Sequence, residues 1–432
     1  MPANDEGDAT LAYDSGVRAP EAGADVGREP SDAGRDPGDA AASDPYAFPS
    51  KDTFPNEDGF YRPPPLSGRA GDVLRSRMSP FTLDILEEAS EASVTARQVL
   101  YQSTDALGQP MAVSGTILVP TAPWTGKGGR PLVSYAVGTR GLGDACAPSY
   151  TLSHGVDYED TTILSLLEQG WAVAVSDYQG SGTPGLHTYM VGPAEGHAVL
   201  DIARAAQRLM GTGLSTSTPV GLMGYSQGGG AAGWAAELAQ SYAPELKLKG
   251  SAIGGVPADL AATAEFLDGS PFVAFALMAA LGLDAAYPEL DLPKYLNDRG
   301  RMMLAAGEQG CLASIDGFGT LLGDTVLSRI DEYVTSNPLH TAAWQARLAD
   351  VQLGKTKPSA PVFQYHGLLD EIVPFDQAAE ARRKWCDLGA DITWEVLPAE
   401  HALGIVLGPP FAVGWLAERF AGMPTASNCK EP

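Results

Sequence analysis

Basic side chains are scarce in this sequence relative to acidic ones: 28 Lys and Arg stand against 53 Asp and Glu, which gives a formal net charge of −25. Nucleic acids and anionic membrane surfaces bind excess positive charge, so we expect neither as a partner. Part of the acidity is local, since residues 1–48 are built mainly of Asp, Ala, Gly, Pro and Ser. Such a segment buries too little apolar surface to offset its ordering entropy, and we expect a disordered acidic leader there.

Long hydrophobic runs are also missing. A membrane-spanning helix needs roughly 20 consecutive apolar residues, and the longest candidate, residues 271–283, is too short. The opening residues lack the basic and apolar regions of a secretory signal. We therefore expect no integral membrane segment, and we expect an exported or cell-surface protein to have had its signal removed from this chain.

Cysteines are few. Four of them lie far apart, at positions 146, 311, 386 and 429, with no CxxC pair and no histidine cluster, which argues against a zinc site. The sequence also lacks a phosphate-binding lysine loop, and we expect no cofactor. The even number and wide spacing of the cysteines fit two disulfides in an exported enzyme, for which three pairings exist. Four reduced thiols in a cytosolic protein are the alternative.

From residue 49 onward the chain alternates short apolar runs with helical patterns, which predicts an α/β fold with a mostly parallel sheet covered by helices on both faces. The first two runs read as an antiparallel hairpin at a sheet edge. The expected strands are 96–101, 111–119, 131–137, 171–177, 220–225, 248–255, 361–365 and 392–397, and the expected helices include 158–169, 194–210, 228–242, 376–388 and 411–420.

One interval interrupts this alternation. Residues 257–357 are mainly helical in character and separate the sixth expected strand from the seventh. We expect them to form a helical cap inserted into a core made of 49–256 and 358–432. Such a cap has its own apolar core, and we expect some of its side chains to line an acyl pocket.

The stretch Gly224-Tyr225-Ser226-Gln227-Gly228 joins an apolar run to an Ala/Gly-rich helical pattern. In a nucleophile elbow, a serine sits in a strained turn between strand and helix, and the residues two before and two after it must be nearly free of side chain. The chain has 50 glycines, so this pattern alone is weak. Its position between a strand and a helix makes Ser226 the candidate nucleophile.

A serine nucleophile needs a base and an acid that orients the base. In α/β-hydrolase folds the acid and then the histidine follow the serine, each after a strand. Asp370 follows the run that ends at Tyr365, and His401 follows the last run, so we predict a triad of Ser226, Asp370 and His401. Glu371 could replace its neighbour, whereas Asp376 is better explained as a helix cap. His366 is expected to be a structural hydrogen-bond partner.

The oxyanion that forms during acyl transfer needs preorganised hydrogen-bond donors. Gln227 follows the serine and offers its backbone N–H. The loop after the 131–137 strand offers the second donor, for which we select Thr139, because its hydroxyl could add a bond.

Several segments together resemble the secretory lipase family of α/β hydrolases. The resemblance covers roughly residues 60–430 and rests on 146–150 (CAPSY), 177–180 (DYQG), 200–205 (LDIARA), 224–229 (GYSQGG) and 366–370 (HGLLD). It implies a helical cap after the sixth strand, a triad on Ser226, Asp370 and His401, and ester hydrolysis without a cofactor. It also implies disulfides that pair Cys146 with Cys311 and Cys386 with Cys429. A well-known member carries an acidic residue in the oxyanion loop, where this chain has Gly138-Thr139-Arg140.

We therefore predict a secreted serine esterase or lipase that hydrolyses small-molecule or lipid acyl esters, polyesters included, through an acyl-enzyme. A serine peptidase of the same fold is the first alternative, although no recognition site for a peptide amine or carboxylate is apparent. A non-catalytic binding protein that keeps the fold is the second, and an intact triad argues against it.

Overall fold

A computed structural model describes residues 53–81, 94–308, 310–312 and 323–430. All of them belong to one compact unit, Ala42–Pro432. The predicted leader, 1–48, lies outside the described residues.

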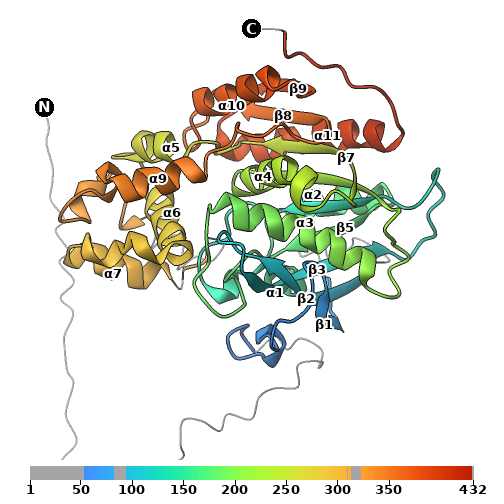
Figure 1. Cartoon of the computed structure of the whole chain (residues 1–432), viewed down its shortest axis with the longest axis horizontal. Helices are drawn as coiled ribbons and strands as arrows, with labels where there is room; N and C mark the ends of the chain where they lie inside the picture. Colours follow the sequence, from blue (N-terminus) through green and yellow to red (C-terminus); the bar gives the residue numbers. More distant parts are fainter. Residues whose placement is uncertain (1–52, 82–93, 309, 313–322, 431–432) are drawn as a thin grey trace, which may run out of the picture. The chain divides into compact units, whose positions relative to one another are not determined.

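The described residues contain one nine-stranded sheet with the order β1-β2-β3-β5-β4-β6-β7-β8-β9 (Figure 1). Strands β1, β2, β3 and β5 pair antiparallel, and from β5 to β9 every pair is parallel. The strands are β1 (Val73–Met78), β2 (Val94–Thr104), β3 (Pro110–Pro120), β4 (Leu132–Ala136), β5 (Ala172–Ser176), β6 (Pro219–Tyr225), β7 (Lys247–Gly254), β8 (Val362–Gly367) and β9 (Ile392–Leu397).

Helices cover both faces of this sheet. On one face α3 and α4 pack together, and α10 joins them through a 2.6 Å hydrogen bond from Trp385 to Glu237. On the other face α2 and α11 contact each other and the middle strands. The helices of the core are α1 (Pro148–His154), α2 (Asp160–Glu168), α3 (Gly192–Arg208), α4 (Gln227–Tyr242), α10 (Phe375–Asp387) and α11 (His401–Phe420).

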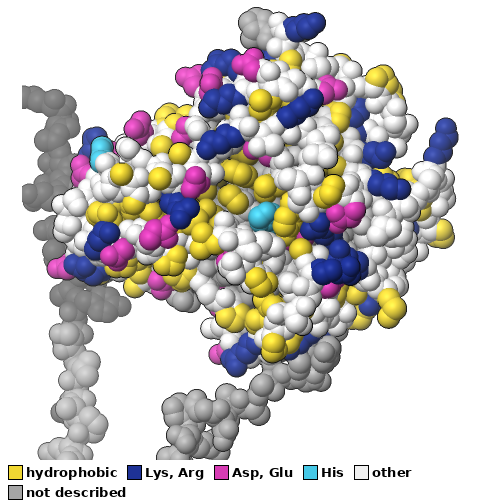
Figure 2. All heavy atoms as spheres, viewed as in Figure 1, with side chains coloured by type: hydrophobic (Ala, Val, Ile, Leu, Met, Phe, Trp, Pro, Cys, Tyr) yellow, Lys and Arg dark blue, Asp and Glu magenta, His cyan; other side chains and the backbone are white. Residues whose placement is uncertain are grey.

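A helical insertion lies between β7 and β8. It contains α5 (Leu260–Leu267), α6 (Val273–Ala286), α7 (Asp298–Gly307) and α9 (Ala342–Asp350), drawn in yellow to orange in Figure 1. The insertion has an apolar core of its own, centred on buried side chains such as Met278, Leu290 and Trp344. On the face shown in Figure 2, acidic and basic side chains are interspersed, and hydrophobic side chains gather where the insertion meets the sheet.

Strand β1 is absent from the strands that the sequence predicts. Its sequence, VLRSRM, carries two arginines and no apolar alternation. It nevertheless pairs with β2, and Arg77 becomes buried because its guanidinium lies 2.7 Å from Asp58 and stacks on Phe60. With β1 counted, the insertion follows the seventh strand.

The predicted start of the last helix at 411 is wrong, because α11 begins ten residues earlier, at His401. Pro409 and Pro410 lie inside it and remove two backbone hydrogen bonds. The helix continues through them because this turn packs tightly on the sheet: a Cβ atom on Gly408 would lie 2.0 Å from the ring of Tyr365.

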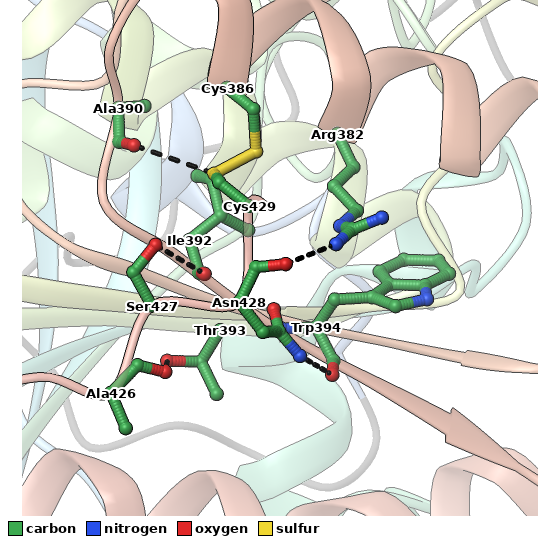
Figure 3. Close-up of a disulfide and its surroundings, with 10 residues drawn as sticks. All are labelled: Arg382, Cys386, Ala390, Ile392, Thr393, Trp394, Ala426, Ser427, Asn428 and Cys429. Atoms are coloured by element: carbon green, nitrogen blue, oxygen red, sulfur yellow. Dashed lines mark hydrogen bonds between the residues drawn. A yellow bond between two sulfur atoms is a disulfide. The ribbon is translucent and has the colours of Figure 1, made fainter. Parts of the chain in front are cut away.

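Two disulfides join the cysteines in the pairs that the family resemblance implies. Cys146, after β4, bonds to Cys311 in the insertion. Cys386, on α10, bonds to Cys429 near the C-terminus (Figure 3).

The C-terminal segment runs along β9, which is the last strand of the sheet. The Asn428 N–H donates to the carbonyl oxygen of Ile392 at 3.0 Å, and its side chain exchanges two further bonds with the backbone of Trp394 (2.8 and 2.9 Å). Arg382 donates to the Asn428 carbonyl at 2.6 Å (Figure 3). This segment therefore covers the open edge of the sheet.

In the described parts of the chain, no single helix is both long and apolar enough to cross a membrane. Helix α6 and the turns that follow it, Pro288–Lys294, reach that length and composition only when taken together across a bend of 111°.

Candidate active site

Ser226 occupies the turn between β6 and α4, with a backbone φ of +58°. A non-glycine residue seldom adopts this conformation, and the strain is characteristic of a nucleophile elbow. The flanking glycines are sterically required. A Cβ atom on Gly228 would lie 2.0 Å from the Ala136 carbonyl oxygen, and one on Gly224 would lie 2.3 Å from that of Gly228. Strand, helix and neighbouring strand can meet here only because both side chains are missing.

The structure brings together the three residues of the predicted triad. His401 Nε2 lies 2.9 Å from Ser226 Oγ, and His401 Nδ1 lies 2.7 Å from Asp370 Oδ2. These are hydrogen-bond distances in the arrangement that a base needs between a hydroxyl and an orienting carboxylate. The three residues follow the C-terminal ends of β6, β8 and β9, which lie on the same side of the parallel sheet.

Asp370 is held as a buried carboxylate. Its Oδ1 accepts backbone N–H bonds from Ile372 and Val373 at 3.0 and 2.7 Å. Burial opposes ionisation, but the hydrogen bond and charge interaction with His401, together with the Val373 N–H, hold the pKa of Asp370 below its usual value. The carboxylate is therefore charged when the imidazole beside it gains a proton.

The neighbours of the triad have positional roles. Glu371, the predicted substitute for Asp370, accepts the backbone N–H of His401 at 3.0 Å instead of its ring nitrogen. Tyr225 donates to the His401 carbonyl at 2.7 Å. Glu400 caps the first turn of α11. His401 is thus fixed at the first position of a helix.

His366 is buried, and its Nε2 lies 2.9 Å from the carbonyl oxygen of Val373 and 3.4 Å from Asp370. Burial lowers its pKa, so it is neutral near pH 7. His187, for which the sequence offered no role, lies near Gln227 (3.3 Å between the side-chain nitrogens). Burial lowers the pKa of His187 to about 4.

Both predicted oxyanion donors line the same cavity as the triad serine and histidine. Gln227 is the first residue of α4, and its side chain donates to the buried Glu195 at 2.7 Å. Thr139 follows β4, and its hydroxyl lies 2.9 Å from that of Tyr189.

A buried ionic cluster beneath the Thr139 loop has no sequence signature. Arg140 contacts Asp157 at 2.6 Å and Glu159 at 2.8 Å, and all three side chains are at least 95% buried. Glu159 also accepts the N–H of Gly138 at 2.8 Å. Since one arginine bridges two carboxylates and one of them, Glu159, also binds the Gly138 backbone, the cluster fixes the course of residues 138–140.

Glu195 is the second unforeseen group. It accepts Gln227 Nε2 and the backbone N–H of Met190 (2.9 Å). Burial, only partly offset by these two bonds, raises the pKa of Glu195 to about 7.

A cavity of about 530 Å³ opens above Ser226, within the range of typical small-molecule sites, roughly 300–1,000 Å³. Its far wall comes from the insertion. The described residues that line it include one histidine, His401, and no Asp, Glu, Lys or Arg. Apolar side chains from the insertion include Leu260, Ala264, Leu267, Phe275, Ala276, Ala280, Leu283 and Trp344. Across the described ranges, no group of three or more His, Cys, Asp or Glu side chains could hold a metal ion.

Residues 147–428 match a family model described as secretory lipase. The chain belongs to the secretory lipase family. Lipase 10 of Candida albicans is 33% identical over 409 residues, which cover 88% of this chain and 84% of that protein. The secreted triacylglycerol lipase LIP7 of Malassezia globosa is 30% identical over 400 residues, which cover 88% and 82%.

Among solved structures, Candida antarctica lipase A in its closed state superposes with a TM-score of 0.76 at 29% identity, covering 88% of this chain and 89% of that chain. These similarities confirm the predicted resemblance to secretory lipases and the α/β-hydrolase fold. They also assign the chain to the carboxylic ester hydrolases.

Proposed function

We propose that this secretory lipase hydrolyses acyl esters through an acyl-enzyme on Ser226, with His401 as the base and Asp370 as the group that orients it. The observation that carries this assignment is the pair of hydrogen bonds of His401, 2.9 Å to the serine hydroxyl and 2.7 Å to the carboxylate. An imidazole held on both sides in this way accepts the serine proton at Nε2 and is stabilised as imidazolium.

In the first half-reaction Ser226 Oγ attacks the carbonyl carbon of the ester, and its proton passes to His401 Nε2. The carbonyl oxygen becomes an oxyanion that accepts hydrogen bonds from the Gln227 backbone N–H and from Thr139. Collapse of this intermediate breaks the bond to the alcohol oxygen, which takes the proton from His401. Water then attacks the acyl-enzyme by the same route, releasing the carboxylic acid and restoring Ser226.

The acyl chain is proposed to bind in the cavity beneath the insertion, which would act as a cap. We set the limits of the core at 49–256 and 358–432 and those of the cap at 257–357. The cap supplies the apolar far wall of the cavity, and an apolar wall favours hydrocarbon over charged groups. A relative named a triacylglycerol lipase supports fatty-acyl esters as the substrate class.

The alternative serine peptidase has less support. Recognition of a free peptide terminus needs a charged or strongly polar partner, and the described residues that line the cavity include no Asp, Glu, Lys or Arg. Polyesters with apolar acyl units fit the same cavity chemistry as lipids. We also propose that the protein is exported, because its two disulfides suit an oxidising compartment.

Turnover of p-nitrophenyl esters from acetate to palmitate, measured beside aminoacyl anilides, tests this proposal. Ester turnover should rise with apolar chain length and should fall about 10⁶-fold in Ser226→Ala. Ala280 on α6 lines the cavity, so Ala280→Phe should narrow the cavity and slow cleavage of the palmitate ester while leaving cleavage of the acetate ester unchanged. Preferred cleavage of the anilides, or full ester turnover by Ser226→Ala, would reject the proposal.

A further inference from the structure

Two hydroxyl groups face each other at the cavity wall. Thr139 Oγ1 and the Tyr189 hydroxyl oxygen lie 2.9 Å apart, and both side chains are buried, with 5% and 4% of their surface exposed. Either oxygen can donate in this bond. A threonine hydroxyl has one hydrogen and two lone pairs. If Thr139 donates to Tyr189, it has no hydrogen left for an oxyanion, so the direction of this bond decides what Thr139 can do.

The backbone around Thr139 is held by hydrogen bonds on both sides. The Gly138 N–H is bound to Glu159, and the Thr139 carbonyl oxygen accepts the Tyr158 hydroxyl at 2.8 Å. Arg140 is locked by its two carboxylate partners. With the backbone held in this way, the rotation of the hydroxyl hydrogen decides to which partner Thr139 donates.

Tyr189 suits the donor role. Burial raises the pKa of its phenol well above the usual value, so the phenol keeps its proton across the working pH range. A phenol is also the stronger hydrogen-bond acid of the two hydroxyls. The loop that carries Tyr189 is fixed as well, because Glu195 binds the next backbone N–H, that of Met190. On the other side, a Cβ atom on Gly282 in α6 would lie 2.1 Å from the Tyr189 carbonyl oxygen.

We propose that Tyr189 is a positioning residue whose hydroxyl donates to Thr139 Oγ1 and so directs the Thr139 hydrogen toward the oxyanion. Tyr189 acts through Thr139 and need not touch the reacting oxygen itself. The inference rests on the proposed function and adds a residue to it. It also links the cap to the chemistry, since α6 packs directly on the backbone of Tyr189.

A double-mutant cycle tests this link, with kcat and KM measured on p-nitrophenyl butyrate. Thr139→Val should lower kcat about 10²-fold, as loss of an oxyanion donor does, with KM changed less than about twofold. Tyr189→Phe should lower kcat about tenfold in the parent chain but less than about twofold in the Thr139→Val background, because the two side chains act as one unit. Thr139→Ser keeps a hydroxyl and should retain most of the activity.

The matched control is Tyr287→Phe, at a buried tyrosine of the insertion core that does not line the cavity; it should leave kcat unchanged. Equal losses from Tyr189→Phe in both backgrounds, or a change in KM alone, would mean that Tyr189 only shapes the pocket. Should Tyr189→Phe not fold by circular dichroism, Thr139→Ser decides, since a loss as large as that of Thr139→Val overturns the inference.

Labelling of Ser226 by a fluorophosphonate separates this inference from the proposed function. A parent chain that cannot be labelled would reject the proposed function. A labelled chain with additive losses in the cycle would reject the role of Tyr189 alone.

Discussion

The two disulfides should differ in what their removal does to catalysis, although both stabilise the fold. In the chain-entropy treatment, the loop of 165 residues closed by Cys146–Cys311 corresponds to about 5 kcal/mol of stability. The loop of 43 residues closed by Cys386–Cys429 corresponds to about 4 kcal/mol. Replacing each pair by serine should therefore lower the free energy of unfolding by similar amounts.

Their positions are not similar. The Cys146–Cys311 bond lies where the insertion crosses the Thr139 loop. There the Leu312 N–H donates to the Arg140 carbonyl at 2.7 Å, and the Leu142 N–H donates to that of Gly310 at 3.1 Å. Without the bond this crossing can separate, and the loop that carries Thr139, the proposed oxyanion donor, can shift. A misplacement of about 1 Å can cost up to about 10²-fold in rate, so we expect kcat to fall between about 10-fold and 100-fold.

The Cys386–Cys429 bond fastens the C-terminal segment to α10, outside the cavity lining. Its double serine variant is the matched control and should keep the parent kcat wherever it is folded. The assay pairs urea unfolding with kcat on a short soluble ester at a temperature where both variants are native. If the two variants lose kcat equally, or if loss of Cys146–Cys311 leaves kcat intact, the proposed coupling between the insertion and the oxyanion loop is wrong.

Three further predictions concern single side chains. Gly228→Ala should lower the free energy of unfolding by about 3 kcal/mol or more, because the new Cβ atom would lie 2.0 Å from a backbone oxygen. Gly414→Ala, which has open space around it, should raise that free energy by up to about 1 kcal/mol. Thermal unfolding measures both effects. Asp370→Asn should lower kcat about 10⁴-fold, while Asp376→Asn, in the first turn of α10, should leave it unchanged. Equal effects of the two glycine variants would contradict the tight elbow at Gly228, and equal effects of the two aspartate variants would contradict Asp370 as the triad acid. The pKa of Glu195 rises from 4.5 to about 7 on folding, so the parent chain loses stability as pH rises through this window. Glu195→Gln should remove about 3 kcal/mol of that loss. Parallel curves of unfolding free energy against pH for the parent and the variant, from pH 4.5 to 8, would refute this.

The middle of the fold could be predicted because its signals are local. A parallel strand buried on both faces is a short apolar run, and all five residues of β5 (Ala172–Ser176) are indeed buried. The elbow at Ser226 is likewise local, since its two required glycines are adjacent in sequence. Strand β1 could not be predicted, because the burial of Arg77 depends on partners distant in sequence, among them Asp58, 19 residues earlier.

Helix α11 shows a local rule overruled by packing. A proline inside a helix costs about 3 kcal/mol, and two in succession predict a boundary. The turn at Gly408 and Pro409 is buried against β8, and its close packing on that strand keeps the helix continuous.

The supports of the candidate site are the least predictable part. Glu195 lies 32 residues before Gln227, and Arg140 reaches carboxylates 17 and 19 residues away. No motif spacing connects these groups, so only the folded chain reveals that they hold Gln227 and the loop of Thr139, the two residues predicted as oxyanion donors.

The C-terminal segment along β9 has a practical consequence for handling the enzyme. A chain shortened before Asn428 would present the main-chain groups of Ile392 and Trp394 to a strand from another molecule. Such a truncated preparation should aggregate during concentration and storage, while each copy that stays in solution keeps its turnover.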